Sequence, residues 1–371
     1  MIAATVPVQR PPDARLLVVN ADGRIDHRPR SDFATLLRSG DLVIANDAAT
    51  LPASLFGVHL PTGQAIEVRL AGRESLCSEC VLEFMAVVFG EGDYRTPTES
   101  RPLPPILRRG DRLQLGILRA RVLELLDHPR LISIGFENAP REIWEGVARH
   151  GRPIQYSHLT APLDIWDTWT PIAGPAAAFE PPSAGFMLDW SVIAAMRHRG
   201  VQFATLTHAA GISSTGDREL DSRLPFDEPY LIPAATAELV NAACARGDRV
   251  IAIGTTVVRA LEHAVTEDGF VPQGEGLARQ RLGPGSALRV VDAILSGVHE
   301  RGTSHHRLLE AFINSELLAR VDEVLEGQGY RTHEFGDSMF VERMQELKVS
   351  KTKFRPIVDK ELRPPRELRT A

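Results

Sequence analysis

Several features that would assign this 371-residue sequence to a familiar class are missing from it. Its three cysteines are too few for a disulfide framework, which is typical of a protein from a reducing compartment. No stretch approaches the ~20 apolar residues that a membrane helix needs. The first residues lack the charged start and apolar core of a secretion signal. We therefore expect a cytoplasmic protein without a membrane segment.

Three motifs of common enzyme sites are also absent. The sequence contains neither Gly-x-Gly-x-x-Gly nor the phosphate loop Gly-x-x-x-x-Gly-Lys-[Ser/Thr], which disfavours dinucleotide and ordinary nucleoside-triphosphate chemistry. Gly-x-Ser-x-Gly is missing as well, so no nucleophile elbow supports a hydrolase.

The sequence has no excess of positive charge. It carries 42 Lys and Arg against 48 Asp and Glu, a net charge of −6, whereas a protein that binds nucleic acid over a wide surface is usually basic. Any RNA contact must therefore be local. The one basic stretch is the C-terminal tail, residues 346–371, which we interpret as a solvated extension, with a phosphate-binding arm as the alternative.

The composition, 43% hydrophobic and 24% charged, is that of a folded globular protein, and the length predicts about two domains. From 14 to 46, and again from about 171 onward, strand-like and helix-like segments alternate, which predicts a largely parallel sheet covered by helices. In the second stretch we expect, among others, a strand over 288–295 and a single helix over 306–327. Residues 51–138 instead contain six short apolar or alternating runs without a helix, followed by a helix, which indicates a small barrel or sandwich.

These patterns together predict an α/β main domain that is discontinuous in sequence, with an inserted small β-barrel domain. We expect the main domain to comprise residues 1–52 and 156–345, the inserted domain 53–155 and the tail 346–371. We also expect a monomer.

The best local signal for a site is Gly254-Thr255-Thr256, which lies between an apolar strand and a helix. Backbone N–H groups and two hydroxyls at a helix N-terminus favour a carboxylate, a phosphate or a ribose oxygen. Simple capping of the helix by threonine is the alternative. Arg259 and Glu262 follow one turn later.

The other candidate residues have simpler explanations. Asn46-Asp47 ends a predicted strand and either orients a ligand hydroxyl or makes a turn before a proline. Cys77-x-x-Cys80 lacks the second ligand pair that zinc needs, which favours structural thiols. His299, with two histidines shortly after it, is not part of a zinc motif, so a hydrogen-bonding or acid–base role is favoured. We therefore expect no metal.

Several segments are similar, in order, to the S-adenosylmethionine:tRNA ribosyltransferase-isomerase family, which makes epoxyqueuosine in tRNA. Residues 42–57 match its Asn-Asp and Pro-Ala-x-Leu-Phe-Gly pattern. Residues 254–264 match its Gly-Thr-Thr-Ser-Val-Arg-Thr-Leu-Glu segment, and 283–299 resemble its Pro-Gly…Val-Val-Asp…His segment. Residues 330–341 resemble its closing Tyr-Arg…Gly-Asp-Ala-Met.

The sequence also departs from the family pattern. Met187 stands where the family has the histidine of Pro-Thr-Ala-Gly-Leu-His-Phe, and Gly302 stands where it has the lysine after His-Leu-Pro. Glu228 alone remains of His-x-Met-His-Ser-Glu, and residues 153–158 differ from Pro-Leu-Pro-Pro-Tyr-Ile. The changes lie near the family's reaction centre.

The resemblance implies that S-adenosylmethionine donates its ribosyl group rather than its methyl group. The sulfonium acidifies the 5′-CH₂, a base removes that proton, and adenine leaves C1′. The amine of 7-aminomethyl-7-deazaguanine in tRNA then attacks the ribosyl fragment, and loss of methionine closes an epoxide. For the base we expect His208 or His299, because imidazole titrates near neutral pH, with Asp47 holding ribose hydroxyls.

For S-adenosylmethionine we expect a binding site formed by Asn46, Gly185, Glu228, Gly254, Thr255, Thr256 and Arg259. Two alternatives remain open. One is a paralogue that uses S-adenosylmethionine with a small-molecule acceptor, and the other is a non-catalytic protein that binds S-adenosylmethionine or tRNA.

Overall fold

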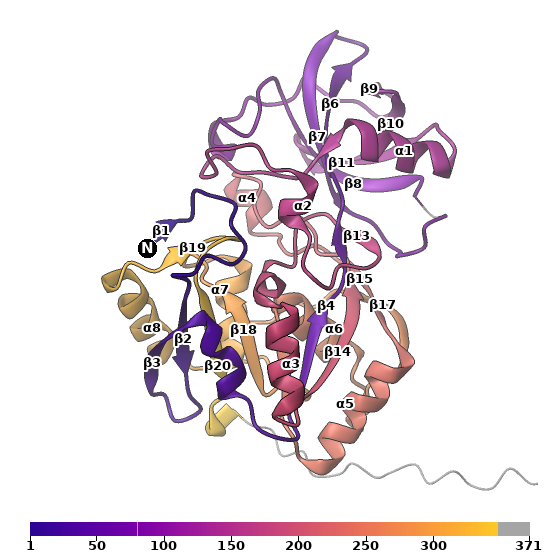
Figure 1. Ribbon diagram of the computed structural model, residues 1–371. Helices are drawn as coiled ribbons and strands as arrows, with labels where there is room; N and C mark the ends of the chain where they lie inside the picture. Colours follow the sequence, from indigo (N-terminus) through magenta and orange to yellow (C-terminus); the bar gives the residue numbers. More distant parts are fainter. Residues whose placement is uncertain (80, 348–371) are drawn as a thin grey trace, which may run out of the picture.

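The computed structural model describes residues 1–79 and 81–347, and within them nine strands form one large sheet (Figure 1). Their order across the sheet is β17-β15-β14-β4-β16-β18-β20-β2-β3. The strands are β2 (Arg15–Val19), β3 (Ile25–Pro29), β4 (Leu42–Asn46), β14 (Gln202–His208), β15 (Glu228–Ile232), β16 (Val250–Ile253), β17 (Gly274–Ala278), β18 (Ala293–Gly297) and β20 (Ser338–Glu342).

The sheet is mixed, with a parallel centre. β14, β4, β16 and β18 are mutually parallel neighbours, and β2 is parallel to β20. The pairs β14–β15, β15–β17, β18–β20 and β2–β3 are antiparallel. The expectation of a largely parallel sheet is therefore correct for the centre and wrong toward the edges, where four pairs of neighbouring strands are antiparallel.

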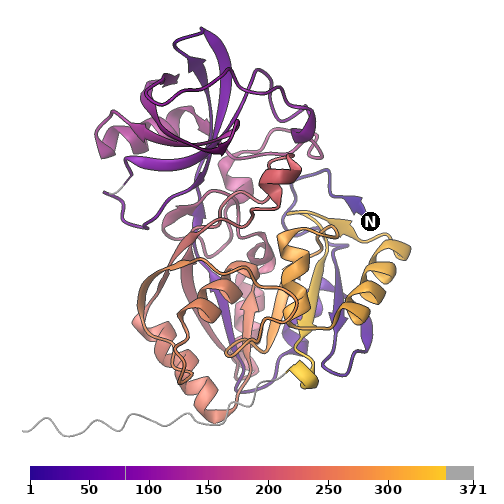
Figure 2. The ribbon, with the colours of Figure 1, turned by 180° about the vertical axis from the view of Figure 1, so that it is seen from behind.

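Helices cover both faces of this sheet, because its central strands are apolar on both sides (Figures 1 and 2). In β4, Leu42 and Ile44 pack in one core with helices α5 (Ala234–Arg246), α6 (Thr255–Ala264) and α8 (Ser315–Gly327). Val43 and Ala45 pack in a second core with the 3₁₀ helix η1 (Arg30–Leu36) and α3 (Trp190–His198). The result is a three-layer α/β arrangement.

The second large sheet contains a closed barrel, seen above the main sheet in Figure 1. Six strands pair in the order β6-β7-β8-β11-β10-β9, and β9 pairs back with β6. They are β6 (Ser54–His59), β7 (Gln64–Gly72), β8 (Glu83–Phe89), β9 (Arg112–Leu115), β10 (Leu118–His128) and β11 (Leu131–Phe136). Helix α1 (Pro140–His150) packs on the barrel, and β12 (Gly151–Arg152) pairs with β6. Of the predicted barrel or sandwich, the barrel is correct.

Shorter elements connect these parts. They are β1 (Ile2–Ala3), β5 (Ala49–Thr50), η2 (Thr98–Ser100), α2 (Ile165–Thr168), β13 (Ala176–Ala178), η3 (Ser183–Met187), α4 (Arg218–Asp221), α7 (Ser304–Leu308), η4 (Leu309–Ala311), β19 (Arg331–Thr332) and η5 (Gln345–Leu347). None of the helices in the described residues is both long and apolar enough to span a membrane. The tail beyond residue 347 and Cys80 of the Cys-x-x-Cys motif lie outside the described residues.

Two sequence predictions need correction. The single helix expected over 306–327 is divided into α7, η4 and α8, because Asn314 caps a new helix by accepting a hydrogen bond from the backbone of Leu317. The strand expected over 288–295 begins only at Ala293. Before it, the Glu262 carboxylate accepts the backbone N–H groups of 289–291, which therefore do not join the ladder.

The seam where β6 pairs with β9 leaves no room for a side chain at Gly57. Gly57 of β6 pairs with Leu115 of β9, and a Cβ at this position would lie 2.0 Å from the carbonyl oxygen of Gln114. Gly57→Ala should therefore lower the free energy of unfolding by about 1–3 kcal/mol or more, because the backbone at the seam has to separate. Urea unfolding measures this effect. Gly327→Ala is the control, since nothing lies within 4 Å of its added Cβ, and equal stability of the two variants would contradict the prediction.

Candidate functional site

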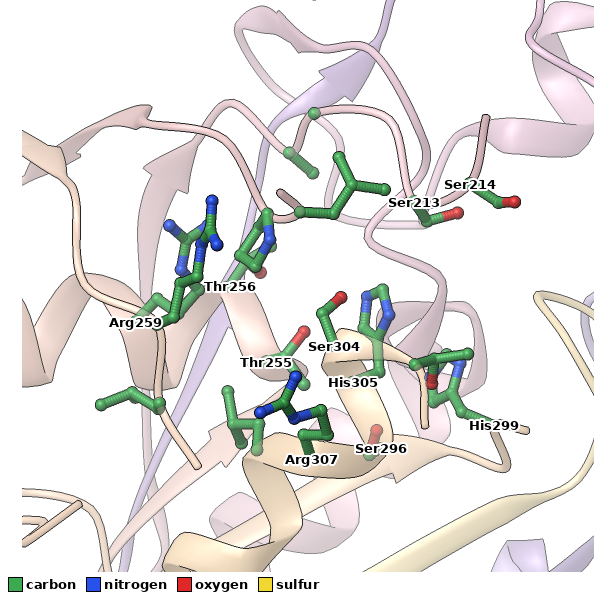
Figure 3. A pocket seen from close by; sticks show the side chains of 18 of the residues that line it. Ser213, Ser214, Thr255, Thr256, Arg259, Ser296, His299, Ser304, His305 and Arg307 are labelled. Carbon is green, nitrogen blue, oxygen red and sulfur yellow. The ribbon is translucent and has the colours of Figure 1, made fainter. Parts of the chain in front are cut away.

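A cavity of about 990 Å³ lies at the edge of the main sheet where the parallel strands end (Figure 3). Its lining comes from residues within 180–184, 210–228, 254–259, 281–286 and 296–308. The parallel strands β14, β16 and β18 run directly into three of these segments. β14 lies on one side of β4 in the sheet and β16 on the other, so the direction of strand addition reverses at β4. The cavity lies at this topological switch point, which is the usual place of ligand sites in open α/β sheets.

Gly254 forms the corner between β16 and α6. Its φ of +92° is a left-handed conformation that suits glycine, and it lets the backbone turn into the helix at the cavity wall. Thr255 and Thr256 follow in the first turn and both line the cavity (Figure 3). No side chain caps this helix, so the alternative of threonine capping is wrong here.

A buried ion pair stands beside this corner. The Arg259 guanidinium donates to the Glu228 carboxylate, and also to the carbonyl oxygens of Phe226 and Ala278. The other oxygen of Glu228 accepts the backbone N–H of Gly211 at 2.6 Å. Burial lowers the pKa of Arg259 to about 10, so the side chain remains a cation at neutral pH. Arg259 and Glu228 both line the cavity, but each already has a partner of opposite charge within the protein.

Two histidines face the cavity together. His299 and His305 stack with ring centroids 4.3 Å apart (Figure 3). Burial holds the pKa of His299 well below its ordinary value and lowers the pKa of His305 to about 4. Both imidazoles are therefore neutral at pH 7, and their free ring nitrogens can accept a proton. His306, the third histidine, points instead to Asp322, with 3.0 Å from Nε2 to a carboxylate oxygen.

Three predicted catalytic or binding residues lie just behind the cavity wall. The His208 side chain is fully buried, and its Nε2 lies 3.6 Å from a Glu228 oxygen, but the ring does not line the cavity. The Asn46 amide donates to the His208 carbonyl and to the Thr256 hydroxyl. The Asp47 carboxylate accepts hydrogen bonds from two threonine hydroxyls of β14. These residues support the wall, and a direct role for any of them remains a prediction.

Gly185 and Met187 lie in η3, on the core side of the wall. A Cβ on Gly185 would lie 3.1 Å from Thr170, so this glycine allows close packing rather than lining the cavity. Met187 is 5% exposed and packs in the core between the sheet and α3. The departure from the family histidine therefore changes a packed position.

Glu180 lines the cavity after β13, although it was not among the residues predicted from the sequence. It is 7% exposed and accepts a hydrogen bond from the Tyr156 hydroxyl. Burial raises the pKa of Glu180 to about 7, although hydrogen bonds from Ser213 and Tyr156 oppose the shift. Glu180 is followed by two prolines, and no pattern in the sequence marks it as a site residue.

The chain is similar in sequence to known proteins over most of its length. A family model described as "Queuosine biosynthesis protein" matches residues 1–341. The S-adenosylmethionine:tRNA ribosyltransferase-isomerase of Pelobacter propionicus is 30% identical over 354 residues, which cover 92% of this chain and 96% of that protein. The enzyme of the same name from Thermus thermophilus is 31% identical over 336 residues, 88% of this chain and 92% of that protein.

One solved structure is also similar, an S-adenosylmethionine tRNA ribosyltransferase from Thermotoga maritima. It covers 91% of this chain and 96% of its own at 22% identity, with a TM-score of 0.48. The chain belongs to the queuosine biosynthesis protein family, as the match over 1–341 and the relative at 30% identity establish, and the resemblance seen in the sequence is confirmed.

The raised pKa of Glu180 predicts a dependence of stability on pH. Between its ordinary value of 4.5 and about 7, Glu180 holds a proton in the folded protein that it has released in the unfolded chain, so its contribution to stability falls as pH rises through this window. The slope is roughly 1.4 kcal/mol per pH unit. Glu180→Gln should remove it.

Urea unfolding between pH 4.5 and 8 measures that slope for the wild type and the variant. Glu238→Gln is the matched control, because Glu238 is an exposed carboxylate on α5 that does not line the cavity. If Glu180→Gln and Glu238→Gln keep the same pH slope as the wild type, the Glu180 pKa is not raised.

Proposed function

We propose that this chain transfers the ribosyl group of S-adenosylmethionine to the amine of 7-aminomethyl-7-deazaguanine in tRNA and isomerises it to the epoxide, releasing adenine and methionine. The observation that carries the proposal is a cavity at the sheet's switch point, lined by the Gly-Thr-Thr corner and a pair of neutral histidines, in a chain of this family. As a reaction on tRNA, it would take place in the cytoplasm.

The lining offers groups for each part of S-adenosylmethionine. Hydroxyls of Thr255, Thr256, Ser296 and Ser304 suit the ribose, and uncapped N–H groups at the start of α6 suit an oxygen. The methionine carboxylate needs a cation that is not already paired with a carboxylate. Arg307, on α7, is the better candidate than Arg259, because Arg259 already binds Glu228.

For the base that removes the 5′ proton, the geometry favours His299 over His208. His299 lines the cavity and its lowered pKa keeps the imidazole in the free-base form at neutral pH. His208 is closed off behind the wall beside Glu228. When His299 takes the proton, its cation lies against a neutral His305 ring, and loss of that proton to water returns the free base.

A small-molecule acceptor is the second candidate, and one observation favours it. Gly302 lines the cavity at the position where the family pattern has a lysine, so a cation expected near the acceptor is absent from this position. An acceptor without phosphates would not need that charge.

We also infer that the two large sheets belong to separate folding units, the barrel being inserted in the main unit. The strands of the main sheet come from 15–46 and 202–342, and those of the barrel from 54–136. This supports boundaries near 53 and 155, with a main domain of 1–52 and 156–345. The basic tail from 346 and the monomeric state remain predictions.

The function is tested by the release of adenine. The full chain is incubated with S-adenosylmethionine, with and without tRNA that carries the aminomethyl-deazaguanine base, and adenine and methionine are measured by liquid chromatography. We expect equal amounts of both products, only when this tRNA is present. Release that needs a small-molecule extract in place of tRNA would support the second candidate, and binding without release would contradict both.

The assignment of the base has its own test. His299→Gln should lower the rate of adenine release by roughly 10²–10⁴-fold, because a glutamine cannot accept the 5′ proton. The same assay under saturating S-adenosylmethionine measures the change in kcat. His198→Gln is the matched control, an exposed histidine at the end of α3 that does not line the cavity. An unchanged rate for His299→Gln would exclude it as the base.

A further inference from the structure

Three ligand-type side chains meet outside the main cavity, from segments far apart in the sequence. His158 follows β12, and His333 and Glu334 lie in the turn between β19 and β20. One ligand atom from each of the three lies within 4.8 Å of the other two. His158 Nε2 is 3.4 Å from a Glu334 oxygen, and the two imidazoles stack with centroids 4.1 Å apart.

His158 and Glu334 form an ion pair at 3.4 Å, but the geometry is not that of a hydrogen bond. His158 Nε2 and Glu334 Oε2 are both buried, and neither makes a hydrogen bond within the described residues. Burying a polar atom without a hydrogen bond is unfavourable. His333 also adopts a φ of +70°, which a non-glycine residue rarely takes. A bound cation that accepts a lone pair from His158 Nε2 and one from Glu334 Oε2 would give both buried atoms a partner.

We propose that His158, His333 and Glu334 bind one divalent transition-metal ion through two imidazole nitrogens and one carboxylate oxygen. Imidazole ligands favour zinc, cobalt, nickel or iron over magnesium and calcium, which prefer oxygen. Bonds of about 2.05 Å in a tetrahedron separate ligand atoms by roughly 3.3 Å. The pair at 3.4 Å already fits. His333 has to approach by about 1.5 Å at most, and one imidazole has to tilt, because the two ring planes are only 11° from parallel.

The cluster lies next to the main cavity and contacts residues that line it. Glu334 lines a small second cavity together with Glu180 and Pro181, and these two residues also line the main cavity. His333 Nε2 lies 3.5 Å from Glu300, another residue of the main lining. Three protein ligands leave at least one position for water or a substrate atom. The metal site does not rest on the proposed function. Sequence spacing gives no sign of it, because His158 and His333 are 175 residues apart along the chain.

The test is metal binding by the full chain after treatment with a chelator. Co²⁺ is the probe, because its visible absorption reports low coordination number and nitrogen ligands. We expect one equivalent to bind and Zn²⁺ to displace it. Glu334→Gln and His333→Asn should each weaken binding at least roughly tenfold, since even residues that only support a ligand are worth 10–100-fold. Asparagine tolerates the left-handed backbone at 333.

His198→Asn is the matched control, because His198 is exposed and lies outside the cluster. A second readout is the melting temperature, which Zn²⁺ should raise for the wild type and the control but not for the two cluster variants. Circular dichroism confirms that each variant is folded. Absence of stoichiometric Co²⁺ binding, or binding that both cluster variants retain, would overturn the proposal, whether or not the chain releases adenine.

Discussion

The central strand β4 is the constraint on which the rest of the structure depends. It lies between β14 and β16, all five of its residues are buried, and the chain that leaves it passes into the barrel. At its end, the Asn46 amide holds the backbone of His208 and the hydroxyl of Thr256. One side chain thus fixes two neighbouring strand ends against the first turn of α6. This arrangement determines where Thr256 and the segment after β14 lie in the cavity wall.

The charges of the cavity wall follow from its burial. Burial of the individual side chains keeps two histidines neutral at pH 7 and raises the pKa of Glu180 to about 7, whereas the buried arginine stays charged beside its carboxylate partner. Proton acceptors are thereby present without adding charge to a site that has to accommodate a sulfonium cation.

The sequence was sufficient for the parts of this architecture that periodicity and local motifs encode. Short apolar runs between helix-like segments predicted the central strands, the six runs of 51–138 predicted the barrel strands, and Gly254 was placed correctly between a strand and a helix. The antiparallel edges, the break at Asn314 and the position of Glu180 depend on tertiary contacts that no local pattern contains. The same is true of His158 and Glu334, which meet only in the folded chain.

The barrel contributes to the cavity from behind rather than by lining it. Within the described residues, no barrel strand lines the main cavity, but Ala71, Val87 and Phe89 of the barrel pack against Ile212 and Leu224, which do. The part of the cavity wall at 254–259 and 296–308 therefore follows strands of the main sheet, whereas the part with Ile212 and Leu224 packs on the barrel. Any rotation of the barrel relative to the main sheet would alter the width of the opening. The size of molecule that can enter would then depend on the packing between barrel and cavity wall, away from His299 and His305.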